Sequence, residues 1–106
     1  MKLYYVYILE CSDKLLYTGI TNYISRRLEE HNLGLNKDSF TFKRRPVEVI
    51  FHQEFREINQ AIWFEKKLKK WSAQKKRALA SEDEILLKLL AECRNECHSG
   101  NNGNSN

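Results

Sequence analysis

The sequence predicts an α+β domain in which a small three-stranded sheet, antiparallel between its first two strands, is flanked by helices in the order β-β-α-β-α-α. Two short runs rich in β-branched and aromatic residues are joined by a turn, and a third such run lies between segments with helical periodicity. The 106 residues are the size of one ordinary domain, and a hydrophobic fraction of 42% is sufficient for one core.

The first two strands are predicted to form a hairpin. Residues 3–10, LYYVYILE, are β-branched and aromatic types, and both alternating faces of this run are apolar. We therefore expect a central strand that is covered on both sides. Ser12, Asp13 and Lys14 supply the turn, and residues 15–21 return as the second strand.

Capping and turn residues mark the middle of the chain. Asn22 is a good N-cap for a helix over YISRRLEEHN, and Gly34 is a plausible C-terminal stop for that helix. Residues 35–45 form a polar, basic loop with two embedded phenylalanines. Pro46 then begins the third strand, VEVIFHQEF, where a proline is tolerated.

The last third of the chain is predicted to be helical. Residues 57–71 form a second helix, and Ser72 can cap a third that begins AQKKRALAS. The acidic run at 82–84 is either a break between two helices or a charged turn. The expected organisation is a catalytic-type domain over 1–80, a helical extension of the same domain over 81–98, and a disordered tail over 99–106.

Positive charge is clustered along a chain of net charge +4 and pI near 9.0. Clustered Lys and Arg residues are the usual electrostatic footprint of nucleic-acid binding, although they also occur on solvated helix faces. The clusters are Lys43, Arg44 and Arg45; Lys66, Lys67, Lys69 and Lys70; and Lys75, Lys76 and Arg77.

The sequence contains no run of about eighteen apolar residues and no recognisable signal peptide, so we expect a cytoplasmic protein that does not enter a membrane. Its three cysteines cannot all pair within one chain, and we expect free thiols. Cys93 and Cys97, with His98 beside them, have a spacing suited to part of a metal site, but a four-ligand zinc site needs more ligands.

Polar residues occupy helix positions that should be buried. Successive helical residues advance by about 100°. When Ile24 and Leu28 define the buried face of the first helix, His31 falls within that face and Arg27 falls at its margin.

The second helix repeats this pattern. When Ile58, Ala61, Ile62 and Leu68 define its apolar face, Glu65 falls near the middle of that face. A carboxylate is costly there unless a cation or hydrogen-bond donor meets it. Each residue also has an ordinary explanation: Arg27 as a surface arginine or ion-pair partner of Glu65, and His31 as a satisfied histidine near a helix end. Together with the hairpin phenols, they suit phosphate chemistry.

In this order the motifs resemble the GIY-YIG nuclease family. The two-part signature of that family is matched by Tyr5-Val6-Tyr7 and Tyr17-Thr18-Gly19, with nine residues between Tyr7 and Tyr17. Three further family residues have counterparts, in order the catalytic arginine, the histidine one turn later and the metal-binding glutamate: Arg27, His31 and Glu65. The resemblance covers about residues 3–77 and is nearest to small stand-alone bacterial members. Tyr5 replaces the first glycine of the family, and Val6 and Thr18 replace its isoleucines.

The resemblance implies a metal-dependent endonuclease that hydrolyses phosphodiester bonds in DNA, with a preference for particular DNA structures and a role in repair or processing. In this scheme Glu65 holds Mg²⁺ or Mn²⁺ and Arg27 pairs with phosphate oxygens. Tyr7 activates water, and His31 either takes the proton or orients Tyr7.

Two further hairpin residues have roles in the implied site. Tyr17 is placed to bond phosphate or water, and Gly19 lets backbone and substrate approach closely. The DNA can be single-stranded, duplex or branched. We expect its backbone to be tracked by basic residues that border the site: Lys43, Arg44, Arg45, Lys66, Lys69 and Lys70.

Two features bear on how substrate is selected. Phe40 and Phe42 either stack on unpaired bases or form a small packing cluster. Larger members of the family carry a separate DNA-binding domain, for which this chain has no room, so targeting is expected to be weak or supplied by a protein partner. Two alternatives stay open: a nucleic-acid-binding module with little or no cleavage activity, and an adaptor that binds a partner through its C-terminal helix.

Overall fold

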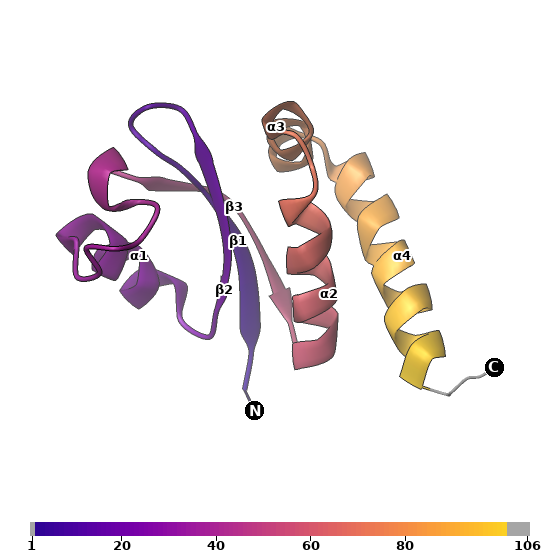
Figure 1. Cartoon of the computed structure of the whole chain (residues 1–106). Helices are drawn as coiled ribbons and strands as arrows, with labels where there is room; N and C mark the ends of the chain where they lie inside the picture. Colours follow the sequence, from indigo (N-terminus) through magenta and orange to yellow (C-terminus); the bar gives the residue numbers. More distant parts are fainter. Residues whose placement is uncertain (1, 102–106) are drawn as a thin grey trace.

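The computed structural model describes residues 2–101, with side chains described as far as Asn95 (Figure 1). The strands are β1 (Tyr4–Glu10), β2 (Leu16–Thr21) and β3 (Glu48–Phe55). The helices are α1 (Ile24–Leu33), the short 3-10 helix η1 (Phe42–Arg44), α2 (Ile58–Lys69), α3 (Ala73–Ser81) and α4 (Asp83–Asn101). Residues 102–106 of the predicted tail lie outside the described range. None of the helices within it has the length and apolar content needed to span a membrane.

β1 is the central strand of the sheet. The strand order is β2-β1-β3, and β1 pairs antiparallel with both neighbours. The predicted α+β fold with a three-stranded sheet and flanking helices is therefore confirmed, and the sheet is antiparallel throughout. The prediction that the first strand is central, made from its two apolar faces, is also confirmed.

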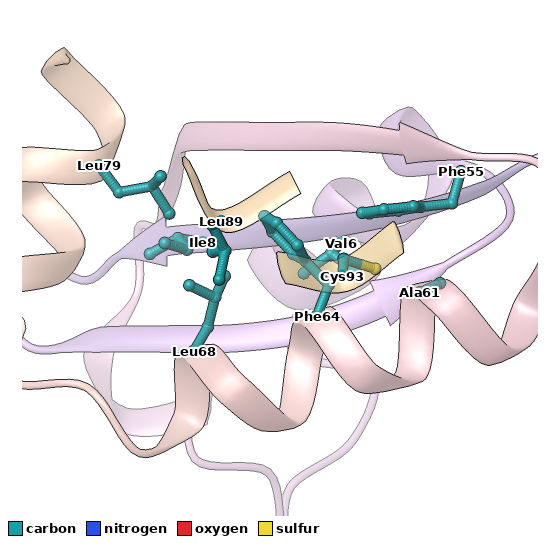
Figure 2. Close-up of a cluster of buried hydrophobic side chains, with 9 residues drawn as sticks. All are labelled: Val6, Ile8, Phe55, Ala61, Phe64, Leu68, Leu79, Leu89 and Cys93. Carbon is teal, nitrogen blue, oxygen red and sulfur yellow. The ribbon is translucent and has the colours of Figure 1, made fainter. Parts of the chain in front are cut away.

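The sheet separates two clusters of buried side chains. In Figure 1, α1 lies on one side of the sheet, and α2, α3 and α4 lie on the other. Val6 and Ile8 point from β1 into the larger cluster, where they meet side chains from α2 and α4 such as Phe64 and Cys93 (Figure 2). The smaller cluster, on the α1 side, is built on Tyr7 and Leu9 of β1 together with Cys11 and Val47, and it is covered by Ile24 and Leu28 of α1.

The buried face of α2 agrees with the predicted one only in part: Ala61 and Leu68 belong to it, as predicted, whereas Ile58 and Ile62 do not. Ala61, Phe64 and Leu68 are fully buried, whereas Ile58 and Ile62 are exposed. Phe64 and Leu68 lie about 120° and 80° around the helix from Ile58, so the true core face is rotated away from the isoleucines. Glu65 consequently lies at the margin of the core face. The prediction that Glu65 lies in its middle is wrong.

The ends of α1 and α3 test the capping predictions. The N-cap of α1 is Tyr23 and not Asn22, and no side chain caps this end; the Asn22 side chain instead accepts a hydrogen bond from Arg26. Gly34 ends α1 in the left-handed conformation, with φ of 68°, as predicted. The Ser72 hydroxyl accepts a hydrogen bond from the Lys75 backbone N–H, which confirms the cap of α3.

The acidic run at 82–84 breaks the C-terminal helical region into two helices. α3 ends at Ser81, Glu82 is extended, and α4 begins at Asp83. α4 then packs along α2, with Leu89 and Cys93 inside the shared core and an ion pair between Lys67 and Glu92. The burial of Cys93 in this core agrees with a thiol that acts as a small apolar side chain.

Asn32 attaches α1 to the start of β3. Its side-chain amide donates to the Val47 carbonyl oxygen at 3.1 Å, and its side-chain oxygen accepts from the Val47 N–H at 2.8 Å. The pair of bonds resembles a short strand pairing, and it fixes the height of α1 over the sheet. That height decides which strand residues the polar face of α1 can reach.

We predict that Phe64→Ala destabilises the protein by about 3–5 kcal/mol, because Phe64 is fully buried and packs against the rings of Phe51 and Phe55. Ile62→Ala on the same helix is the matched control and should cost less than about 1 kcal/mol, since Ile62 is 36% exposed. Urea unfolding of both variants measures the difference. Equal losses would show that the core face of α2 has been assigned to the wrong residues.

Candidate active site

The hairpin places the phenol of Tyr7 across Gly19. The two residues are paired directly opposite each other on β1 and β2, so their side-chain positions share one face of the sheet. A Cβ atom added to Gly19 would lie 2.5 Å from the Tyr7 hydroxyl oxygen. Only glycine therefore leaves room for this ring, which is a requirement that the sequence analysis missed.

α1 brings Arg27 and His31 to the same phenol. The Arg27 Nε–H donates to the Tyr7 hydroxyl oxygen at 3.4 Å, and that oxygen lies 3.4 Å from the Nε2 atom of His31. Tyr7 is 2% exposed and His31 is 5% exposed, whereas Arg27 is partly open to solvent. The predicted positions of His31 within the buried face and Arg27 at its margin are thus confirmed.

Tyr17 lies beside His31, and the ring of Phe40 stacks on the Tyr17 ring. The Tyr17 ring centroid is 5.3 Å from that of His31, and Phe40 stacks on its other side at 6.0 Å with an interplanar angle of 24°. The guanidinium of Arg44 lies 4.2 Å over the Phe40 ring. Of the two explanations left open for Phe40, packing is the one that this structure shows.

Thr41 is a site residue that the sequence analysis did not identify. It is fully buried, and its hydroxyl oxygen lies 2.7 Å from the Nδ1 atom of His31 and 3.1 Å from the hydroxyl of Ser39. A threonine between two phenylalanines in an otherwise polar loop was the available signal. Next to it, a small pocket of about 100 Å³ is lined by residues that include Arg27, His31 and Ser39.

The charges around the phenol have definite directions. Burial raises the pKa of Tyr7, although the hydrogen bond from Arg27 opposes that shift. Burial also lowers the pKa of His31, and the Arg27 charge adds to this effect while Glu30 opposes it. The hydrogen bond to Tyr7 raises the pKa of Arg27, which is also paired with Glu30 at 3.0 Å. The resting site therefore combines a neutral phenol, a neutral imidazole and a charged guanidinium.

Glu65 stands apart from these residues. Its side chain is 14% exposed and pairs with the Lys69 ammonium at 2.9 Å. That hydrogen bond raises the pKa of Lys69, and the Tyr17 phenol adds a smaller effect in the same direction. Among the described residues, no hydrogen bond or ion pair joins Glu65 to Tyr7, Arg27 or His31. The structure thus brings four of the five predicted catalytic residues together. The fifth, Glu65, is related to Tyr17 only through Lys69, whose pKa both of them raise.

The capacity for a metal ion follows from this arrangement. In the described part of the chain, no group of three or more His, Cys, Asp and Glu side chains is placed to hold a metal. The Glu65 carboxylate already has a cation against it, the Lys69 ammonium, and it is partly open to solvent. One accessible carboxylate fits a hard cation that keeps most of its waters. The side chains of Cys97 and His98 lie outside the described ones, so the Cys93 motif is not resolved.

The predicted DNA-contacting residues fall into two groups. Lys43, Lys66, Lys69 and Lys70 are exposed, and Lys69 is also paired with Glu65. Arg44 and Arg45 hold the loop instead: Arg44 pairs with Asp13 and donates to the Phe40 carbonyl oxygen, and Arg45 donates to that of Phe42. Both keep part of their surface in solvent.

Lys76, in the third basic cluster, is buried and not part of a solvated face. Burial lowers its pKa, and the nearby charge of Lys69 acts in the same direction. Lys76 therefore does not add to the exposed positive surface that Lys66, Lys69 and Lys70 form.

A family model for the GIY-YIG catalytic domain matches residues 3–78. The chain belongs to the GIY-YIG family. The match includes every predicted catalytic residue and ends before α4 begins. The two-part GIY-YIG signature lies on the β1-β2 hairpin described above. The resemblance of this chain to the family, inferred from the motifs, is therefore confirmed.

Relatives of this GIY-YIG protein include small proteins of similar length. A UPF0213 protein of Syntrophus aciditrophicus is 42% identical over 79 residues, which are 74% of this chain and 91% of that protein. A UPF0213 protein of Haloquadratum walsbyi is 40% identical over 79 residues, which are 74% of this chain and 88% of that one. The solution NMR structure of a protein from E. faecalis is 34% identical, with a TM-score of 0.58 over 80% of this chain and 90% of that chain. This likeness supports the GIY-YIG-like fold.

We predict that His31 titrates below the ordinary histidine pKa of 6.5, because burial and the Arg27 charge both disfavour the imidazolium. Arg27→Gln should raise the pKa of His31, and Arg26→Gln, which removes a more exposed charge, should leave it nearly unchanged. NMR titration of the histidine rings measures both.

The same shift links His31 to stability. The unfolded chain binds a proton at His31 more readily than the folded protein does. Protonation of His31 therefore has no effect on the free energy of unfolding well above pH 6.5, and it lowers that free energy as the pH falls below 6.5. A wild-type His31 pKa above 6.5 would contradict the arrangement of charges described here.

Proposed function

We propose that this GIY-YIG protein is a divalent-metal-dependent endonuclease that hydrolyses phosphodiester bonds in DNA. The observation that carries the proposal is the convergence of Arg27 and His31 from α1 on the buried hydroxyl of Tyr7. A phenol held between a fixed positive charge and a neutral imidazole suits proton abstraction beside a phosphate.

The chain supplies charge and a base for the reaction. Arg27 uses Nε toward Tyr7 and Nη1 toward Glu30, which leaves Nη2 for a phosphate oxygen. A tyrosinate at Tyr7 would take a proton from water as the water oxygen forms a bond to phosphorus and the bond to the leaving oxygen breaks. That leaving oxygen then takes up a proton. Tyr7 must lose its own proton first, since burial keeps its pKa above the ordinary value.

Glu65 is the residue that would hold the metal ion. When bound, Mg²⁺ or Mn²⁺ supplies positive charge to the phosphate and to the leaving oxygen. Lys69 would have to release the Glu65 carboxylate for this, and phosphate and water oxygens would have to supply the remaining ligands. The exposed residues Lys43, Lys66 and Lys70 would bind the DNA backbone in a salt-dependent way without choosing sequence. Preference for a DNA structure, or a targeting partner, would then set the physiological substrate.

A second candidate function is a DNA-binding module that cleaves little. Two observations favour it: the raised pKa of Tyr7 makes the phenol a poor base, and Lys69 already occupies the Glu65 carboxylate. In this case the basic surface binds nucleic acid while the site stays in its resting state. Salt-dependent binding without turnover in any divalent metal would select this function over the first.

We predict that the purified protein cleaves at least one of single-stranded, duplex and branched DNA when Mg²⁺ or Mn²⁺ is present. Arg27→Ala and Glu65→Gln should each lower the cleavage rate by about a hundredfold or more, because each removes charge that acts on the phosphate in the transition state. Arg26→Ala is the matched control, since Arg26 is adjacent in α1 but points to Asn22. Equal cleavage rates in the Arg27→Ala and Arg26→Ala variants would contradict the proposal.

Removal of the competing ammonium should strengthen metal binding. We predict that Lys69→Met binds Mn²⁺ about two- to fivefold more tightly than the wild type, because an exposed ion pair contributes up to about 1 kcal/mol. Electron paramagnetic resonance of free Mn²⁺ measures this without any substrate. Lys70→Met is the control for simple loss of positive charge, and Glu65→Gln should abolish the gain. Equal affinity in the Lys69 and Lys70 variants would show that Lys69 does not compete at this carboxylate.

A further inference from the structure

We propose that Thr41 is a positioning residue that fixes the tautomer of His31, so that Nδ1 carries the proton and the unprotonated Nε2 faces the Tyr7 hydroxyl. The use of this arrangement in catalysis rests on the proposed nuclease function. The tautomer itself is a property of the folded protein alone.

The direction of the hydrogen bonds begins at Arg27. A guanidinium N–H can only donate, so the Tyr7 oxygen accepts from Arg27 Nε. The phenol hydrogen of this buried side chain needs an acceptor, and the other hydrogen-bond neighbour of its oxygen is His31 Nε2 at 3.4 Å. An acceptor at Nε2 needs a lone pair there. Both contacts are longer than ideal, as is common in a site without substrate.

The other ring nitrogen completes the assignment. A neutral imidazole with a bare Nε2 carries its hydrogen on Nδ1, and Nδ1 lies 2.7 Å from the Thr41 hydroxyl oxygen. Thr41 can accept this hydrogen and donate its own to the hydroxyl of Ser39, 3.1 Å away. In the opposite tautomer the Tyr7 oxygen would accept from both Arg27 and His31, and the phenol hydrogen would have no acceptor among the contacts of this side chain, which is only 2% exposed.

Burial makes Thr41 hard to replace by water. Thr41 is 0% exposed and His31 is 5% exposed, so solvent has little access to the Nδ1 side. The loop also holds the Thr41 backbone: the Phe42 N–H donates to the Ser39 carbonyl oxygen, and the Arg44 N–H donates to that of Thr41. Phe40, stacked between Tyr17 and Arg44, closes the loop over the site. The hydroxyl of Thr41 is therefore kept where Nδ1 needs an acceptor.

This arrangement gives His31 a single task in the proposed reaction. The Tyr7 O–H bond breaks and a bond forms from that proton to His31 Nε2, which leaves a tyrosinate beside Arg27 and an imidazolium that still donates from Nδ1 to Thr41. The net charge of the site does not change. The sequence left open whether His31 takes the proton or orients Tyr7, and the geometry points to the first.

The test uses the full chain labelled with ¹⁵N, at a pH above 7.5, without metal or DNA. Two-bond ¹H–¹⁵N correlation spectra distinguish the tautomers of a neutral histidine. We expect His31 in the wild type to be protonated at Nδ1. Thr41→Val removes the hydroxyl at nearly constant volume and should give a mixture of tautomers or the Nε2–H form, whereas Thr41→Ser should behave as the wild type.

Two results would overturn the inference: an Nε2–H tautomer in the wild type, or an unchanged Nδ1–H tautomer in folded Thr41→Val. The first needs no variant, so the test survives a Thr41→Val chain that fails to fold. In the cleavage assay we expect Thr41→Val to lower the rate about ten- to a hundredfold and Thr41→Ser to retain most of it. A wild type with the Nδ1–H tautomer and no cleavage on any DNA would support the role of Thr41 in fixing the tautomer and reject only the nuclease proposal.

Discussion

The close approach of the Tyr7 phenol to the Gly19 backbone is the constraint on which the site depends. The two residues face each other across the β1-β2 pair, and the Tyr7 ring lies so close to Gly19 that a side chain there would collide with it. The hydroxyl then projects toward α1, where Arg27 and His31 can reach it. A bulkier residue at position 19 would lift the ring and disconnect the hairpin from the helix, even if every other residue stayed in place.

The same group of residues reduces the cost of forming charges in a buried site, in a protein with a net charge of +4. Burial disfavours both a tyrosinate and an imidazolium when each is formed alone. Proton transfer from Tyr7 to His31 forms both together, next to a guanidinium that attracts the first and a glutamate, Glu30, that favours the second. A neutral resting pair that can exchange one proton is compatible with burial, whereas a permanently charged base would have to be exposed.

Much of the fold and about half of the site could be predicted from the sequence. There are physical reasons why the remainder could not. Periodicity located the central strand and placed Arg27 and His31, because one face of α1 is marked by apolar residues. It misplaced Glu65, because the predicted face of α2 included two isoleucines that are exposed and left out Phe64, which is fully buried. Thr41 was missed because it lies in a loop, where contacts depend on tertiary packing and leave no periodic signal. Arg44 and Arg45 were predicted as DNA contacts from their charge and from their place before a strand that should border the site. Neither signal could show that some of their donors bond loop carbonyls.

The position of β2 explains how residues on opposite sides of a sheet can serve one site. β2 is an edge strand, so nothing in the sheet separates its outer side from the helices that flank it. Tyr17, on this strand, contacts the His31 ring, and its phenol adds a small effect to the raised pKa of Lys69 in α2, which comes mainly from the hydrogen bond with Glu65. A phosphate seated over Tyr17 would therefore meet groups from both helices around the sheet edge. A central strand such as β1 could not play this part, since both of its neighbours block the way, and this is why the second tyrosine of the hairpin has to stand on the edge.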